Sequence, residues 1–290
     1  MGQTRRPGIA EPGTISRLFS RILYSARSAA RGPFLVESFL PDSQLHDMFE
    51  NIGTTYDVQN HLLSFGRDIH WRQILALLVG REPAEVVCDM ATGTGDVAIE
   101  LARRYRSLRI FAVDYSQKML AVADSKIRKP GNARIRDRIQ LIHSDIRRTP
   151  VAECSADVVT ISFALRNIPE RRPALEEFFR VLKPGGRLFI MEFALPQSRF
   201  IGRAYRLYFD HVMPFIGNLL SRTDYAYSYL KESVHGFPSP ERFSAEIAAA
   251  GFDGVKALPL TFGLSTVYCA RRPRTAAARR PRTAGEGNSN

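Results

Sequence analysis

The chain has 290 residues, of which 44% are hydrophobic, and this is enough for one sizeable core with a small appendage. Its formal net charge of +12 would ordinarily suggest a nucleic-acid partner. However, residues 1–36 and 270–290 each carry a net charge of +5, and the stretch between them carries only +2. The charge therefore belongs to the two ends, and it argues against nucleic-acid binding by the folded body.

Hydropathy and cysteine usage narrow the class of protein further. No apolar run approaches the ~18 residues needed to cross a bilayer, and no secretory signal is present. The three cysteines, Cys88, Cys154 and Cys269, form no C-x-x-C pair, which favours free thiols in a reducing compartment.

Residues 1–45 form a basic N-terminal extension. Apolar residues recur at helical spacing between Ile15 and Leu23, with arginines among them, as in an amphipathic helix on an anionic membrane surface. The same composition fits an organellar transit peptide or a disordered extension, and all three interpretations remain open. The C-terminal tail, residues 271–290, is rich in arginine and is expected to be disordered.

Between the two ends, residues 46–270 alternate between strand-like and helix-like patterns and are expected to form one domain. The predicted strands are residues 86–91, 109–113, 139–142, 157–163, 187–193, 255–260 and 265–270. The predicted helices are residues 67–80, 96–105, 116–127, 172–182 and 240–250. This alternation predicts an α/β, Rossmann-like, mostly parallel sheet with helices on both faces.

The last two predicted strands are joined by only about four residues, which is too short for a parallel crossover. They should therefore pair as an antiparallel hairpin. A seven-stranded, mostly parallel sheet with one antiparallel strand is typical of class I methyltransferases, whereas dinucleotide-binding sheets usually stay parallel.

The stretch "VVCDMATGTGDVAIELA", residues 86–102, reads as a strand, a glycine loop and a helix. Gly93 and Gly95 fit both a dinucleotide loop and the first motif of S-adenosylmethionine (SAM) methyltransferases, and Thr94 lies between them. Asp114, at the end of the next strand, suits the ribose of either cofactor. Asp89 favours SAM, because a carboxylate attracts its ammonium and sulfonium groups and repels a pyrophosphate; Asp89 could also simply cap the strand end.

Polar residues follow the third and fourth predicted strands as well. Asp145 is placed to accept from the adenine amino group, and Ile146 is placed to pack on the ring. Ser162, Arg166 and Asn167, in "VVTISFALRN", are expected to face the same crevice. The "KPGG" that follows is interpreted as a tight, structural turn before the fifth strand.

The stretches "MFENIGTTYDVQNHLLSFGRDIHWR", "DMATGTGD", "ISFALRNIP" and "RVLKPGGRLFIMEFALP" together resemble the ubiquinone/menaquinone-biosynthesis C-methyltransferases, the UbiE-like group. The resemblance covers about residues 48–270. It implies transfer of a methyl group from SAM to a ring carbon of a prenylated hydroquinone. It also implies that Thr94, Asp114, Asp145, Ile146 and Ser162 contact SAM. Where the family often has Asn-Ala, this chain has Asp145-Ile146, and the arginine-rich ends have no counterpart in the family.

Methylation at carbon needs an electron-rich ring, so the substrate should be the reduced quinol. Arg166 is placed to stabilise its phenolate, and its structural alternative is an ion pair with the helix at 170–182. Since a guanidinium is normally protonated, Arg166 should not itself accept the proton. Asn167 could orient the quinol oxygen or cap the next helix.

Residues 199–235 contain eight Phe or Tyr residues and are expected to form a helical substrate lid, with plain core as the alternative. His211 in this segment is a second candidate proton acceptor or a buried structural histidine. Tyr56, Asp57 and Asn60 are expected to form a flap over SAM, or the last two could cap a helix. No histidines show metal-ligand spacing, and no metal is predicted.

We expect a cytoplasmic enzyme at the inner face of the membrane, or a mitochondrial matrix enzyme if residues 1–36 are a transit peptide. It could be a homodimer and could associate with other quinone-biosynthesis enzymes. The main alternative is a SAM methyltransferase for another lipophilic phenol or sterol. An RNA methyltransferase is suggested by the isoelectric point alone, and a hydride-transfer enzyme by the glycine loop alone.

Overall fold

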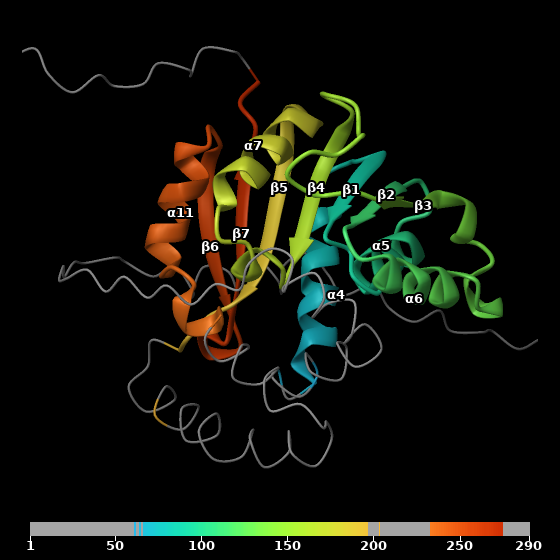
Figure 1. The fold of residues 1–290 in the computed structure, drawn as a ribbon, viewed down its shortest axis with the longest axis horizontal. Coiled ribbons are helices and arrows are strands. Elements are labelled where there is room, and N and C mark those ends of the chain that lie inside the picture. Colours follow the sequence, from blue (N-terminus) through green and yellow to red (C-terminus); the bar gives the residue numbers. More distant parts are fainter. Residues whose placement is uncertain (1–60, 62–63, 65, 197–202, 204–232, 275–290) are drawn as a thin grey trace, which may run out of the picture. The chain divides into compact units, whose positions relative to one another are not determined.

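The computed structural model describes residues 61, 64, 66–196, 203 and 233–274, all of which belong to one compact unit, residues 38–290. Its centre is a seven-stranded sheet in the order β3-β2-β1-β4-β5-β7-β6. Figure 1 shows the strands in this order, from β3 at the right to β6 at the left. Strand β7 runs antiparallel to both of its neighbours, and the other pairs are parallel. The predicted class I methyltransferase sheet and its closing hairpin are confirmed.

The elements lie close to their predicted positions. The strands are β1 (Val86–Met90), β2 (Arg109–Asp114), β3 (Ile139–His143), β4 (Ala156–Ser162), β5 (Leu182–Phe193), β6 (Asp253–Leu260) and β7 (Ser265–Arg271). The helices are α4 (Arg67–Val79), α5 (Asp96–Arg104), α6 (Gln117–Ile127), α7 (Arg171–Val181) and α11 (Pro240–Ala249). Short 3-10 turns include η3 (Leu165–Asn167) and η5 (Thr261–Gly263).

The central strands are apolar along nearly their whole length because both faces of the sheet are covered. Right-handed crossovers place α5 and α7 on opposite faces, since β1 to β2 and β4 to β5 advance in opposite directions across the sheet. Two helices begin at serine caps, where Ser116 accepts from the Met119 amide and Ser239 accepts from the Arg242 amide.

Strand β5 differs from its prediction at its start. It begins at Leu182 rather than at residue 187, so the predicted Pro-Gly-Gly turn lies within the strand as a bulge. The register shows this directly, because Ala156 pairs with Leu182 and Val158 with Arg187. Gly185 lies in the bulge at φ 81°, a conformation that only glycine adopts without strain.

The C-terminal boundary also lies further along than residue 270. Strand β7 ends at Arg271, and the Arg272 guanidinium donates to the carbonyls of Phe179 and Leu182 at 2.8 and 2.7 Å. This side chain stabilises the carbonyl groups at the end of α7, which have no partner within the helix. The first residues of the predicted tail are therefore part of the fold.

Several predictions fall on residues that lie outside the described ones. These are the N-terminal extension, the flap residues Tyr56, Asp57 and Asn60, most of the predicted lid, and His211. Within the described ranges, no helix has the length and hydropathy of a membrane-spanning segment.

Candidate active site

The strand order reverses between β1 and β4, and in open α/β sheets ligands bind beyond the carboxyl ends of the strands at this point. Strained backbone marks the place. Ala91, directly after β1, has φ 50°, and Phe163, directly after β4, has φ 59°. A non-glycine residue in this region costs on the order of 1–3 kcal/mol and persists only where the surrounding structure enforces it.

Packing and hydrogen bonding enforce the conformation of Phe163. The side chain is 1% exposed and lies against Phe193 and Trp71, with ring centroids 4.4 and 6.2 Å apart. Its amide donates to the carbonyl of Met191 at 2.8 Å. The indole of Trp71 in turn donates to Thr261 Oγ1 in the β6–β7 turn at 2.8 Å. The carboxyl edge is thus built on a buried aromatic cluster.

The glycine loop follows β1. Gly93 has φ 57°, and among the described residues a Cβ added to it would meet no atom within 4 Å. Gly95, at φ 83°, is the N-cap residue of α5, where an added Cβ would lie 3.1 Å from Ala123 Cβ. Gly93 therefore lets a ligand approach the backbone, whereas Gly95 lets α5 pack closely on α6.

Asp114 ends β2 and holds this loop. Its carboxylate accepts from the Gly93 amide at 2.7 Å and from the Ser116 amide at 2.9 Å. The side chain is buried, and burial raises the pKa of Asp114 although these amide bonds act to lower it. A carboxylate offers about four lone-pair positions, so Asp114 retains acceptor capacity for a ligand's hydroxyl groups.

Asp89 is 1% exposed and lies beneath the loop. Its two oxygens accept from Thr160 Oγ1 at 2.6 Å and from Thr92 Oγ1 at 2.7 Å. Burial raises the pKa of Asp89 to about 6, against the effect of the two hydroxyl bonds. Asp89 thus places a carboxylate below the glycine loop, and its hydrogen-bond donors are neutral hydroxyl groups. Direct contact between Asp89 and a cationic ligand stays a prediction.

Thr94 belongs to a charged network that no sequence pattern indicated. Lys126 Nζ donates to Thr94 Oγ1 at 2.8 Å and to Asp96 Oδ1 at 2.7 Å. Arg72 Nη1 lies 3.5 Å from Asp96 Oδ2 and donates to the buried Asp68 at 2.5 Å. The network joins the glycine loop to α4 and α6 and so fixes the start of α5.

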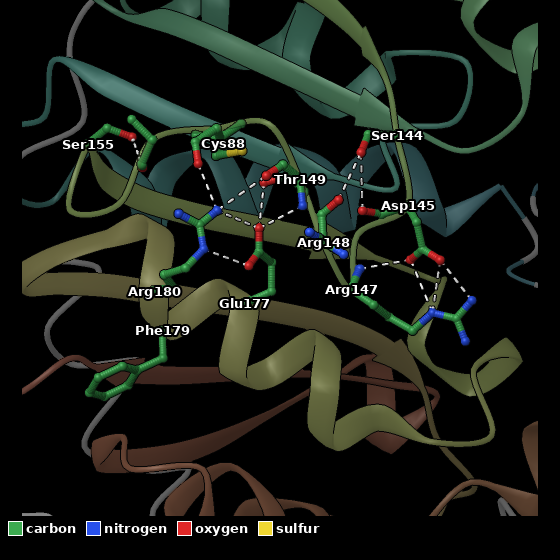
Figure 2. Close-up of polar contacts among 12 residues, drawn as sticks. Cys88, Ser144, Asp145, Arg147, Arg148, Thr149, Ser155, Glu177, Phe179 and Arg180 are labelled. Carbon is green, nitrogen blue, oxygen red and sulfur yellow. Dashed lines mark hydrogen bonds and ion pairs between the residues drawn. The ribbon is translucent and has the colours of Figure 1, made fainter.

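Asp145 and Ile146 follow β3 and lie beside the end of β2, since the Ser144 amide donates to the Asp114 carbonyl at 3.0 Å. Figure 2 shows the Asp145 carboxylate against the Arg147 side chain, with Nη2 to Oδ2 at 2.7 Å. Burial acts to raise the pKa of Asp145, but the Arg147 bonds outweigh it and hold this pKa below its usual range. Ile146 is buried in the core.

Ser162 is the last residue of β4, and its hydroxyl group is the next feature of the site. Its Oγ is buried, and within the described part of the chain it has no hydrogen-bond partner. A buried polar atom without a partner costs about 1–3 kcal/mol, so such atoms call for an explanation. Together with the open face of Gly93, this hydroxyl fits a site whose remaining contacts come from a polar ligand.

Arg166 and Asn167 lie in η3, directly after Phe163, and both are buried. The Arg166 guanidinium donates to the Phe163 carbonyl, lies 3.3 Å from Glu192 Oε2 and sits over the Phe193 ring, 5.2 Å from its centroid. This ion pair joins Arg166 to Glu192 of β5, whereas the structural alternative expected an ion pair with the helix at 170–182. Helix α7 has Glu170 at its N-cap, so Asn167 does not cap it.

Glu192 is the residue that the sequence analysis missed most clearly. It is 1% exposed, and burial raises its pKa although Arg166 acts to lower it. A signal was present in "GRLFIMEF", because an acid inside the apolar run of a doubly covered strand is rarely there without a partner. Only the three-dimensional structure identifies that partner as Arg166.

Among the described residues, Cys88, Cys269 and the acidic groups suggest no second chemistry. Burial raises the pKa of the Cys88 thiol, and it raises that of Cys269 to about 11, so neither is an activated nucleophile. In the ranges that the structure covers, no group of three or more His, Cys, Asp or Glu side chains could hold a metal ion.

A model of the ubiE/COQ5 methyltransferase family matches residues 38–272, which include every site residue described above. The chain belongs to this family. Its relatives include the demethylmenaquinone methyltransferase of Thermus thermophilus, 40% identical over 226 residues, which cover 78% of this chain and 100% of the relative. The ubiquinone/menaquinone biosynthesis C-methyltransferase UbiE of Geobacter sulfurreducens is 41% identical over 230 residues, 79% of this chain and 88% of the relative.

The fold has counterparts among solved structures. A putative O-methyltransferase from Nostoc punctiforme has a TM-score of 0.56 and 17% identity, covering 78% of this chain and 61% of that one. The family membership makes the chain a SAM-dependent methyltransferase, with SAM as the methyl donor. Gly93, with no described atom near its Cα face, and the Ser162 hydroxyl, with no hydrogen-bond partner among the described residues, fit this cofactor.

Proposed function

We propose that this enzyme transfers a methyl group from SAM to a ring carbon of a prenylated hydroquinone in menaquinone or ubiquinone biosynthesis. The substrate would be of the demethylmenaquinol or 2-polyprenyl-6-methoxy-benzoquinol type. The observation that carries the proposal is the identity of about 40% with relatives named for these reactions, over nearly their whole lengths.

In this proposal, SAM lies across the carboxyl ends of β1, β2 and β3. The Gly93–Gly95 loop admits it, Asp114 accepts from the ribose hydroxyls, and Asp145 accepts from the adenine amino group while Ile146 packs against the ring. Asp89 attracts the cationic end of the cofactor, and Thr94 and Ser162 add hydrogen bonds. SAM, when bound, supplies a methyl group on a cationic sulfur.

The acceptor lies beyond β4 and β5, where Arg166 stabilises its phenolate. The phenolic O–H bond would break first, which makes the ring carbon nucleophilic. This carbon would take the methyl group as the bond between that methyl and the SAM sulfur breaks; the ring C–H proton would then be lost and the oxygen reprotonated, so that one proton leaves in all. Since the buried guanidinium stays protonated, Arg166 lowers the energy of the anion and does not take either proton. Asn167 orients the quinol oxygen, and His211 is the candidate proton acceptor.

The prenyl tail of such a substrate resides in a lipid bilayer, so the enzyme would work at a membrane surface. Residues 199–235 would cover the tail, and the basic residues 1–45 would contact anionic lipid. We assign the enzyme to the inner face of the cytoplasmic membrane, with no nucleic-acid partner.

The test is to incubate the full chain with SAM and, separately, a reduced prenyl-naphthoquinol and a reduced prenyl-methoxybenzoquinol, and to read product masses. Carbon methylation gives a product that can still be oxidised to a quinone, whereas oxygen methylation does not. Methylation of neither quinol, with activity on another lipophilic phenol or a sterol, would overturn the proposal.

A further inference from the structure

We propose that Glu192 is a positioning residue of the reaction, which fixes the Arg166 guanidinium and supplies its counter-charge at the acceptor side of the site. This inference rests on the proposed function, because it acts through the role given there to Arg166.

Glu192 holds both the backbone and the side chain of Arg166. Its Oε1 accepts from the Arg166 amide at 3.2 Å, and its Oε2 lies 3.3 Å from Arg166 Nη1. Oε2 also accepts from the Phe193 amide at 3.2 Å. One carboxylate therefore sets the conformation of η3 and the direction of the guanidinium at the same time.

Both members of the pair are buried, with the Arg166 side chain 2% exposed and the Glu192 side chain 1% exposed. Taking two charges out of water costs several kcal/mol for each ion, and a well-packed apolar pair is often as stable. Stability therefore gives no reason to bury this pair, and its long 3.3 Å contact does not suggest a bond optimised for strength. Its place next to Ser162 and the strained Phe163, at the carboxyl edge, gives a functional reason instead.

A second pair in the same protein shows what a structural Glu–Arg contact looks like here. Figure 2 shows Glu177 of α7 between Arg180 and Thr149. Glu177 accepts from the Thr149 amide and hydroxyl and from two nitrogens of Arg180, all at 2.7 Å. Burial acts to raise the pKa of Glu177, but these bonds outweigh it and hold the pKa below its usual range, whereas that of Glu192 stays above.

Two titratable groups that interact with Glu192 are Arg166, from η3, and Tyr268, from β7. Burial raises the pKa of Tyr268, and the Glu192 charge raises it further, so this phenol stays neutral. Arg166 is thus the group whose position depends on whether Glu192 is ionised.

The experiment compares Glu192→Asp with Glu192→Gln at saturating SAM. Gln matches the shape of Glu and lacks its charge, whereas Asp keeps the charge and is one methylene shorter. We expect Gln to lower kcat about 100-fold and Asp only about 10-fold, in line with the cost of misplacing a catalytic group by about 1 Å. SAM affinity should stay within about threefold, since Glu192 lies at the acceptor side.

The pH profile adds a readout that packing alone would not move. In the wild type, kcat should fall on the acid side as Glu192 takes up a proton and releases Arg166, and this fall should be missing in Glu192→Gln. The matched control is Glu177→Gln, which should lower the melting temperature and leave kcat at saturating SAM unchanged. If Glu192→Gln does not fold, the kcat and SAM affinity of Glu192→Asp decide the question.

A Gln variant as active as the Asp variant, or more active, would overturn the inference, because shape and not charge would then matter. Equal losses of SAM affinity and kcat would overturn it too. A wild-type enzyme that methylates neither quinol would overturn the proposed function first, and the inference with it.

Discussion

The two ends of the sheet hold their carboxylates in opposite ways. At the amino ends of the strands, Asp157 accepts from the Glu85 and Val86 amides, both at 2.9 Å, and from Lys183 Nζ at 2.6 Å. Burial acts to raise the pKa of Asp157, but these donors hold it below its usual range. At the carboxyl ends, burial raises the pKa of Asp89, Asp114 and Glu192.

This contrast indicates at which end of the sheet a ligand binds. At the amino end, Lys183 supplies the positive charge that balances the Asp157 carboxylate. At the carboxyl end, Asp89 and Asp114 are held by hydroxyl and amide groups, which leave the negative charge under-compensated. Carboxylates in this condition gather at functional sites, and a cationic cofactor such as SAM would supply the missing charge. Two other carboxylates at this end pair with an arginine: Asp145 with Arg147, which holds its pKa low, and Glu192 with Arg166, where burial still keeps the pKa raised.

The largest effect is expected for Arg166→Ala, which tests the carboxyl end of the sheet. If the guanidinium stabilises the phenolate, turnover should fall about 100- to 1000-fold, the usual cost of losing one electrostatic donor in the transition state. SAM affinity should change little, because the role proposed for Arg166 is at the acceptor and not at the cofactor. Steady-state kinetics with the quinol and calorimetric titration with SAM measure the two quantities, and similar losses in both would make Arg166 a structural residue.

The next test is Asp114→Ala, with Asp157→Ala as its matched control. Both carboxylates accept from two backbone amides, but only Asp114 lies at the carboxyl end. Asp114→Ala should weaken SAM binding about 100-fold, because charged hydrogen bonds contribute about 1.5–3 kcal/mol each. Asp157→Ala should lower stability and leave SAM affinity unchanged. Unchanged SAM affinity in Asp114→Ala would remove this residue from the ribose role.

The smallest expected effect is the pH dependence of SAM binding through Asp89. Because its pKa is raised to about 6, Asp89 takes up a proton as the pH falls from 7 to 5, and the attraction for a cationic ligand is lost. If SAM favours the ionised form, its affinity should be about tenfold weaker at pH 5 than at pH 7. Asp89→Asn should bind SAM weakly at both pH values. An equally steep pH dependence in that variant would assign the titration to another group.

Much of the fold could be predicted because its signals are local. Apolar runs bounded by turn residues located all seven strands, and the short link at Thr261–Leu264 predicted the antiparallel hairpin. The start of β5 was misplaced because the Pro-Gly-Gly segment is chemically a turn, and only its pairing with β4 makes it a bulge within a strand.

Some residues of the candidate site could likewise be predicted from local signals, and others could not. The glycine loop and Asp114 follow strand ends, so the topology alone brings them to one edge of the sheet. The partners of the site charges are distant in the sequence: Thr160 is 71 residues from Asp89, and Glu192 is 26 residues from Arg166. No spacing rule connects such positions.

The fold class, the cofactor loop and the family follow from the sequence, since each depends on residues that are close together along the chain. Which charges are buried and which groups neutralise them follows from the three-dimensional arrangement, because burial and charge pairing act through space. That is why the arginine after β4 could be found in the sequence, and the carboxylate that holds it could not.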